Sequence, residues 1–289
     1  MIIDNKQIIV SGKVIKTVRI AEEWYEDLQD PVAFLKELKT KVKADLFTFW
    51  QRLPENQPKY DYHLEWESIA VLPITDYDYW WNKQISAKTR NVIRKALKSG
   101  VVVKSIEYDD DFVRGLVEIF NESPVRQGKP FWHYGKDFAC IKKEFSRNLH
   151  REEIIGAYFN NKLIGFIMLA DAGKYAMTTQ ILSMIRHRDK SPTNALLAKA
   201  VEICASRHIP YLVYAMWTTG SLGDFKLHNG FEKIDLPRYF IPLTTRGLIA
   251  IKLNLHRGIK NAVPNNIKTG LAKMRKKWYM KSKDKVNGG

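Results

Sequence analysis

The stretch S-A-K-T-R-N-V-I-R-K-A-L-K-S-G-V-V-V, residues 86–103, is the most informative part of this chain. Ser86 is a good helix N-cap, and Gly100 stands where a helix ends in the left-handed conformation. The stretch therefore predicts a helix followed by a strand from residue 101. Apolar residues recur along it at helical spacing and predict one buried face, namely Ile85, Thr89, Val92, Ile93, Ala96 and Leu97.

Another face of the same helix is cationic. Residues 82–104 contain seven Lys or Arg and no Asp or Glu. Five of these cations lie along or beside one row of the helix: Lys88, Arg90, Arg94, Lys95 and Lys98. A helix ordinarily offsets such charges with acidic side chains, so an unpaired cationic face indicates an anionic ligand from outside the chain. A basic face that only contacts water is the alternative interpretation.

The rest of the chain alternates between strand and helix patterns. Before the basic helix we expect a hairpin over 7–20, a helix over 31–43 and strands near 45–53 and 62–72. After it we expect a helix from Asp109 to Asn121 and a three-stranded meander over 154–184. A helix over 192–207, a strand over 211–216, a short helix over 221–228 and a last strand to about residue 243 complete the order.

Two of these patterns resemble a known family. The pattern K-x-R-x-x-I-R-K-A-x-K-x-G-V at 88–101 resembles the Fem-type transferases, bacterial enzymes that add amino acids to peptidoglycan precursors. These enzymes are similar to the GNAT acyltransferase superfamily. The order of elements over 108–243 resembles the GNAT fold, and F-K-L-H-N-G-F at 225–231 is similar to that superfamily's F-Y-E-K-x-G-F run.

This resemblance implies the fold class and its division into domains. We expect an α/β (α+β) protein with tandem GNAT-like halves, in which mixed, largely antiparallel sheets are flanked by helices. Residues 1–107 would form a degenerate N-terminal half, 108–243 the acyltransferase half, and 244–289 a basic helical tail.

The resemblance also implies where a cofactor-like donor would bind. In GNAT enzymes the turn R-x-x-G-x-G/A holds the pyrophosphate of coenzyme A with backbone amides and a helix N-terminus. The equivalent turn here is R-D-K-S-P-T-N, residues 188–194, in which Ser191 and Thr193 replace both glycines. The expected donor-binding residues are Arg188, Ser191, Thr193 and Asn194. A plain helix N-terminus with ordinary caps is the alternative.

Candidate catalytic and substrate-binding residues lie in three further places. Lys226 occupies the position of the GNAT general acid, and His228 follows two residues later. The loop 122–135 has no periodicity and carries Arg126, Lys129, His133 and Tyr134, so we interpret it as a lid. The predicted catalytic residues are Lys226, His133, Tyr134 and His228. The predicted substrate-binding residues are Arg90, Arg94, Lys95, Arg126, Lys129 and Arg238, the last of which could instead form a structural ion pair.

Charge, cysteine content and the absence of certain motifs indicate where the protein works and which kinds of site it lacks. The net charge is +16, and residues 246–289 contribute +11 of it, with twelve Lys or Arg against Asp284. Apolar residues at 267, 271, 274 and 278 give this tail an amphipathic pattern that favours anionic membrane, with tRNA as the alternative. Cys140 and Cys204 are expected as buried free thiols, and the chain as cytoplasmic, at or near the inner membrane face. No motif indicates a metal site or a nucleotide-binding loop.

The resulting expectation is an N-acyltransferase. An amine acceptor, such as a phosphorylated or lipid-linked cell-envelope precursor, would attack an activated carbonyl directly. Backbone amides near Leu182–Met184 would stabilise the oxyanion. The co-substrate would be acyl-CoA or aminoacyl-tRNA, with no tightly bound cofactor. The alternative is a catalytically inactive GNAT-like module that binds anionic membrane or nucleic acid.

Overall fold

The computed structural model describes residues 1–257, which fold into two compact units. The first contains residues 1–51, 58–65 and the part of the chain from 237, and the second contains 52–57 and 66–236. This division differs from the expected boundaries at 107 and 243. The physical reason is that Ala70, Leu72, Ile93 and Val101, which precede residue 107, belong to the apolar core of the second unit. The amphipathic tail pattern at 267–278 lies outside the described residues.

The first unit is a mixed sheet with two helices. Its strands are β1 (Ile2–Ile3), β2 (Lys6–Ser11), β3 (Thr17–Ile20), β4 (Leu46–Trp50) and the second half of β13 (Glu232–Pro242), in the order β1-β2-β3-β4-β13. Only the β3–β4 pairing is parallel. The helices are α1 (Pro31–Lys41), capped by Asp30 as expected, and α8 (Thr245–Lys252), followed by η3 (Leu255–Arg257).

The second unit contains the segments that resemble the GNAT fold. Its strands run in the order β5-β12-β11-β10-β9-β6, with a single parallel pairing between β11 and β12. They are β5 (His63–Pro73) from residue 66 onward, β12 (Tyr211–Met216), β11 (Ala176–Ser183), β10 (Lys162–Asp171), β9 (Glu152–Phe159) and β6 (Val102–Ile106). The expectation of mixed, largely antiparallel sheets is confirmed.

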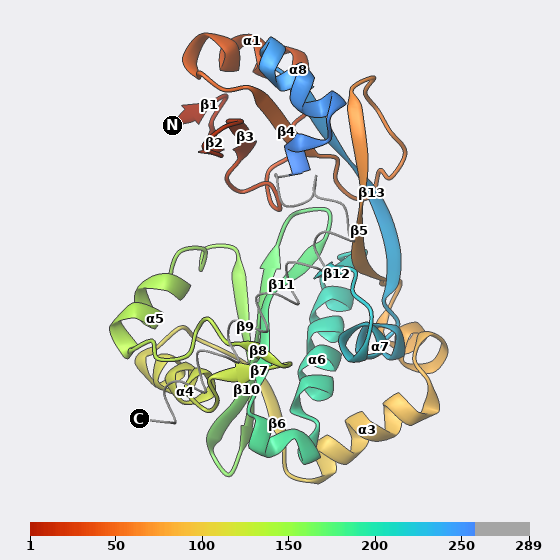
Figure 1. The fold of residues 1–289 in the computed structure, drawn as a ribbon. Coiled ribbons are helices and arrows are strands. Elements are labelled where there is room, and N and C mark those ends of the chain that lie inside the picture. Colours follow the sequence, from red (N-terminus) through yellow and green to blue (C-terminus); the bar gives the residue numbers. More distant parts are fainter. Residues whose placement is uncertain (258–289) are drawn as a thin grey trace, which may run out of the picture. The chain divides into compact units, whose positions relative to one another are not determined.

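Helices lie on both sides of this second sheet (Figure 1). They are α2 (Tyr77–Tyr79), the π-helical η1 (Trp80–Gln84), α3 (Ala87–Lys98), α4 (Asp110–Phe120), α5 (Phe138–Phe145), η2 (Ile185–Lys190), α6 (Pro192–Ser206) and α7 (Ser221–His228). Residues 122–135, expected as an irregular lid, contain the small hairpin of β7 (Val125–Arg126) and β8 (Lys129–Pro130).

The basic helix α3 forms where the sequence predicts it. Ser86 accepts a hydrogen bond from the Thr89 amide at its start, and Gly100 adopts φ +90° directly after its end. Its apolar face is buried as expected except at Val92, which is partly buried, and Leu97, which is half exposed. Thr89 also donates to the carbonyl of His228, which fastens α3 to the end of α7.

One fully buried side chain connects this region with the α7 turn. Trp80 has no exposed surface, and its indole Nε1 donates to the carbonyl of Asn229 at 3.0 Å. Trp80 also contacts the turn at Gly230, which has φ +88° and in which a Cβ would come within 3.5 Å of Nε1. Trp80 therefore holds the end of α7 by packing and by one buried hydrogen bond.

The two cysteines differ in solvent exposure. Cys204 is buried, and burial raises its pKa to about 12. Cys140 is exposed, so the expectation of two buried thiols is wrong for it. The reason is the orientation of α5, whose buried residues are Ile141 and Phe145.

Candidate functional site

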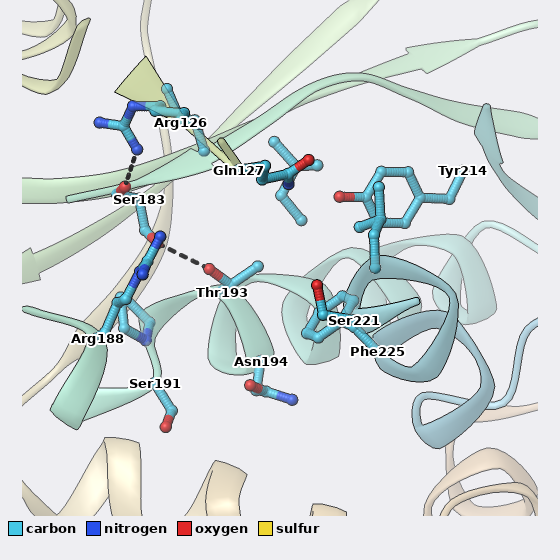
Figure 2. A pocket seen from close by; sticks show the side chains of 14 residues that line it. Arg126, Gln127, Ser183, Arg188, Ser191, Thr193, Asn194, Tyr214, Ser221 and Phe225 are labelled. Carbon is cyan, nitrogen blue, oxygen red and sulfur yellow. Dashed lines mark hydrogen bonds between the residues drawn. The ribbon is translucent and has the colours of Figure 1, made fainter. Parts of the chain in front are cut away.

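The candidate site is a cavity of about 420 Å³ in the second unit. It opens where two parallel strands separate: β11 and β12 pair only through Ala176–Leu212 and Met177–Val213, although β11 continues to Ser183 and β12 to Met216. Figure 2 shows side chains from β11, α6, β12 and α7 around the resulting space. The residues that line it include Arg126, Gln127, Ser183, Arg188, Ser191, Thr193, Asn194, Tyr214, Ser221 and Phe225.

All four residues expected to bind the donor line this cavity. The turn that carries them keeps the backbone shape that a glycine would allow, because Ser191 adopts φ +50°, ψ +45° directly before α6. No side chain caps the N-terminus of α6. Thr193 is held by a 2.8 Å hydrogen bond between its hydroxyl and that of Ser183. The positive end of the helix dipole therefore faces the cavity.

Glu122 holds the segment that leads into this turn by direct hydrogen bonds. Its carboxylate accepts hydrogen bonds from the backbone amides of Ile185 (2.5 Å) and Arg186 (2.9 Å), at the start of η2. It also pairs with Arg126 at 3.2 Å. The exposed Arg188 lies one turn further along η2, and its side chain makes no hydrogen bond or ion pair within residues 1–257. Glu122 thus fixes the segment that presents an unpaired guanidinium to the cavity.

Arg126 lines the cavity but has partners in the protein. Its guanidinium donates to the carbonyls of Ser183 (2.9 Å) and Ile119 (2.7 Å), in addition to the contact with Glu122. Desolvation by burial lowers its pKa from the ordinary value, and Glu122 opposes that effect. Arg126 therefore connects the β7–β8 hairpin with β11 and α4, and contributes positive charge at the cavity edge.

Tyr214 is the functional candidate that sequence reasoning missed. It lies in a bulge of β12: Val213 pairs with Val71 and Met216 with Ile69, and Ala215 between them has φ +49°. Bulges commonly redirect a side chain next to an active site. Burial raises the pKa of the Tyr214 phenol to about 12, so the hydroxyl stays protonated at neutral pH. The only signal in the sequence was an aromatic residue near the end of a predicted strand.

Lys226 is buried behind Tyr214 and does not line the cavity. Its Nζ donates to the carbonyl of Met216 at 2.7 Å and lies 4.6 Å from the centre of the Tyr214 ring. Burial lowers its pKa to about 8. Lys226 therefore satisfies the carbonyl that the β12 bulge leaves available, and it supports the position of Tyr214.

The remaining predicted residues lie away from this cavity. Tyr134 and Lys129 are exposed on the segment 122–135, and His228 is exposed at the end of α7. Arg90 donates to the carbonyls of Trp81 and Ile85, and Arg94 lies over the Trp81 ring at 5.3 Å. In the first unit, Arg238 pairs with Glu23 at 3.0 and 3.3 Å, which supports the structural ion pair. The exposed Lys95 has no ion pair within the described range.

His133 lies in an aromatic cluster of the second unit. Its ring stacks on Phe120 with centroids 4.4 Å apart, and it is 1% exposed. Burial lowers its pKa to about 4; the Lys136 charge adds to this shift, and Glu144 opposes it. The imidazole is therefore neutral at pH 7, and it does not line the cavity.

We expect His133 to make stability pH-dependent. An unfolded histidine takes up a proton near pH 6.5, whereas the folded one resists protonation until about pH 4. The free energy of unfolding should therefore decrease as pH falls from 6.5 to 4, by about 3 kcal/mol from this group. His133→Phe should remove that contribution, and His208→Ala, on an exposed histidine, should retain it. Urea unfolding of the three proteins at several pH values measures the difference; parallel curves for wild type and His133→Phe would contradict it.

Solved structures resemble this chain, whereas known family profiles and curated sequences do not. No known family profile and no curated protein sequence matches the chain. The C-terminal domain (DUF2156) of a putative lysylphosphatidylglycerol synthetase from Agrobacterium fabrum superposes with a TM-score of 0.55, at 12% identity, over 86% of this chain and 84% of that one. L-PGS from Bacillus licheniformis gives 0.53, at 12% identity, over 88% and 87%. FemX gives 0.47, at 13% identity, over 74% and 70%.

At such identities the likeness establishes the fold alone. The order of strands and helices over 152–242 is the one that the sequence predicts from the GNAT superfamily. The chain therefore has a GNAT-like order of elements and a fold similar to that of the two L-PGS proteins. The described residues include no helix long and apolar enough to cross a membrane.

Proposed function

We propose that the second-unit cavity is the transfer site of an N-acyltransferase, which moves an aminoacyl or acyl group from an activated donor to an amine. One observation carries the proposal: the unpaired Arg188 guanidinium and the protonated Tyr214 phenol line the same cavity. The guanidinium suits a donor phosphate. The phenol suits a leaving group that needs a proton.

The phosphate of the donor would bind at the start of α6. Arg188 supplies a charge that no described carboxylate neutralises, and the uncapped helix end adds its dipole. Ser191 in the left-handed conformation keeps the turn open without a glycine. Together these features favour an anionic group at this end of the cavity.

The reacting carbonyl would lie along the separated edge of β11. The Met184 amide already donates to Ile164, so it is not available to an oxyanion. Antiparallel pairs alternate in their hydrogen bonding, so the Leu182 backbone faces β10, whereas that of Ser183 faces the opening. The Ser183 carbonyl indeed accepts from Arg126 on that side. Within the expected segment Leu182–Met184, the Ser183 amide is the best oxyanion donor.

The proposed reaction needs no covalent enzyme intermediate. The acceptor nitrogen attacks the donor carbonyl carbon, and the Ser183 amide stabilises the tetrahedral oxyanion. The bond from that carbon to the donor oxygen or sulfur then breaks, and the leaving atom takes the Tyr214 proton. The proton that the amine loses returns to Tyr214 through water, so the enzyme is unchanged after the cycle.

We favour aminoacyl-tRNA as the donor and a cell-envelope precursor as the acceptor. The name of the lysylphosphatidylglycerol synthetase with the same fold describes an aminoacyl group joined to a phospholipid. Exposed lysines of α3 without an ion pair in the described range, Lys88, Lys95 and Lys98, suit tRNA phosphates. Acyl-CoA is the second candidate, favoured by the retained shape of the Ser191 turn. The same proposal places the enzyme at the cytoplasmic face of the membrane, with residues 246–289 as the contact. It also includes a tandem GNAT origin of the two units.

Substitution of Arg188 tests the proposal. We expect Arg188→Gln to weaken donor binding by about 10–100-fold, the equivalent of one hydrogen bond to a charged group. Arg186→Gln is the matched control, because Arg186 belongs to the same short helix, is exposed and does not line the cavity. Binding of lysyl-tRNA and of acetyl-CoA to each full-length protein should be measured at one salt concentration.

The two probes also separate the donors. Tight binding of lysyl-tRNA that Arg188→Gln weakens supports the aminoacyl donor, and the same pattern with acetyl-CoA supports the acyl-CoA donor. If both probes bind wild type and Arg188→Gln equally, or neither binds, the proposed donor site is wrong.

A further inference from the structure

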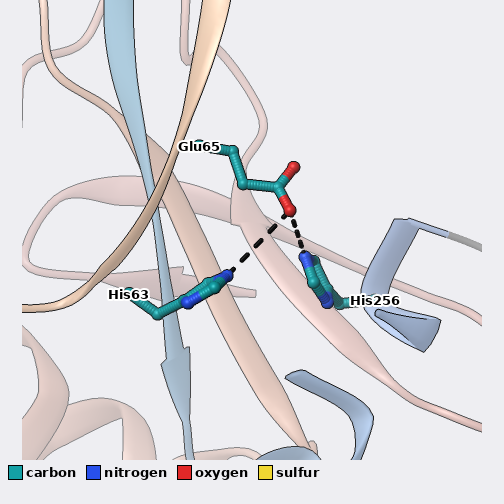
Figure 3. Close-up of side chains that lie close together, drawn as sticks. All are labelled: His63, Glu65 and His256. Carbon is teal, nitrogen blue, oxygen red and sulfur yellow. Dashed lines mark hydrogen bonds and ion pairs between the residues drawn. The ribbon is translucent and has the colours of Figure 1, made fainter. Parts of the chain in front are cut away.

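Three ligand-type side chains meet in the first unit, apart from the cavity described above. His63 and Glu65 lie two residues apart on β5, so they project from the same face of the strand. His256 belongs to η3, 191 residues from Glu65. One ligand atom of each side chain lies within 4.8 Å of those of the other two (Figure 3).

The surroundings of these groups are those of a built site. The His256 side chain is fully buried, that of Glu65 is 16% exposed, and that of His63 is 41% exposed. The ring of Phe240 lies 4.6 Å from that of His256 and forms an apolar wall beside it. Such a shell limits solvent access and favours an ion that needs few water ligands.

Nε2 of His256 and Oε1 of Glu65 lie 2.5 Å apart, so a hydrogen atom or a metal ion lies between them. The Nδ1 atom of His256 faces the Ala250 carbonyl at 3.5 Å, a position from which it can donate when Nε2 binds a metal ion. The ring is therefore oriented as a metal-binding histidine with an outer partner would be.

We propose that His63, Glu65 and His256 bind a divalent transition-metal ion of the zinc class, with water as a fourth ligand. Two imidazoles and one carboxylate form a donor set that suits zinc, and its usual site is tetrahedral. Ligand atoms in such a site lie about 3.3 Å apart, given metal–ligand distances of about 2.0–2.1 Å. Glu65 Oε1 lies 2.5 Å from His256 Nε2 and 4.0 Å from His63 Nε2, so the three side chains would have to adjust their positions to hold an ion.

The ion would have a structural role, because it would fasten η3 to β5 within the first unit. The Ala250 carbonyl would act as the outer partner that fixes the orientation of His256. The alternative is a hydrogen bond from His256 to Glu65 and no metal. That alternative gives His63 no role, so substitution of His63 distinguishes the metal site from the metal-free pair.

The experiment uses the full-length, untagged protein after treatment with a chelator. Zn²⁺ is titrated by calorimetry, and Co²⁺ by its visible absorption, which reports coordination by nitrogen and oxygen ligands. We expect one equivalent of either ion, and His63→Ala and Glu65→Gln should each weaken binding by at least about 10–100-fold, the usual loss for an outer-shell partner alone. His208→Ala, on an exposed histidine elsewhere, should bind as wild type.

His63→Ala is the decisive variant, because its half-exposed ring can be removed with little effect on packing. Circular dichroism of each variant checks that it remains folded. Absence of stoichiometric binding to wild type, or binding that His63→Ala does not weaken, would overturn the metal site in favour of the hydrogen-bonded pair.

Discussion

Tyr214→Phe should lower kcat by about 10²–10⁴-fold, the usual contribution of a positioned general acid. The substitution removes one hydroxyl from the cavity and leaves the ring, so donor binding and the free energy of unfolding should change little. The reason for the large effect is position: the phenol, which burial keeps protonated with a pKa of about 12, lines the cavity where we propose that the leaving group lies. Single-turnover transfer measured with saturating donor isolates this step.

A second buried tyrosine provides the control. Burial also raises the pKa of Tyr108 to about 12, but its hydroxyl donates to the Lys142 carbonyl and does not line the cavity. Tyr108→Phe should therefore leave kcat unchanged. Equal rates for wild type and Tyr214→Phe would show that another group supplies the proton, and a loss of donor binding would assign Tyr214 to recognition.

Trp80→Ala should lower the free energy of unfolding by about 3–5 kcal/mol, as expected for a large aromatic side chain removed from a core. Trp80 has no exposed surface, and its indole hydrogen bond to Asn229 is lost together with its packing. Because Asn229 directly follows α7, which lines the cavity, activity should fall as well. Urea unfolding followed by circular dichroism measures the loss.

Two further substitutions separate the loss of packing at Trp80 from the loss of its hydrogen bond, and both from the general effect of removing a tryptophan. Trp80→Phe keeps most of the packing and leaves the Asn229 carbonyl unpaired, so we expect a loss of about 1–3 kcal/mol. Trp66→Ala removes a tryptophan that is 51% exposed and should change stability by about 0.5 kcal/mol or less. A small loss for Trp80→Ala, similar to that for Trp66→Ala, would contradict the proposed anchoring role.

Local sequence signals predicted most of the secondary structure. Caps defined the helices: Asp30, Ser86 and Asp109 each accept a hydrogen bond from an amide of the helix that follows. Runs rich in apolar residues, with a turn at Asn160-Asn161, predicted the antiparallel strands β9, β10 and β11. The turn at 188–194 was predicted from its resemblance to the GNAT phosphate turn, and its residues line the cavity, whereas its binding of a donor stays a prediction.

The parts of the site that the sequence could not reveal depend on pairing over long distances. Tyr214 faces the cavity because β12 bulges against β5, and that register joins residues more than 100 positions apart in the chain. Glu122 orients the segment of Arg188 through amides 63 and 64 residues away. No local pattern encodes such contacts.

Titratable side chains in the loops were the least predictable. His133 resembles a lid histidine in sequence, yet it packs in the core against Phe120. Burial depends on the surrounding aromatic residues, which come from separate elements. The proximity of His63 and His256 could not be predicted either, because sequence motifs reveal a group of ligand-type residues only when their spacing is short.

Hydrogen exchange of backbone amides upon donor binding tests the central claim most directly. With lysyl-tRNA or acetyl-CoA in excess over the full-length protein, whichever binds should slow exchange in two segments that line the cavity, 181–183 and 191–194. Arg188→Gln should lose this protection at the same donor concentration, whereas Arg186→Gln should keep it. Binding that leaves both segments unprotected would show that the donor lies elsewhere, and the proposed transfer site would be wrong.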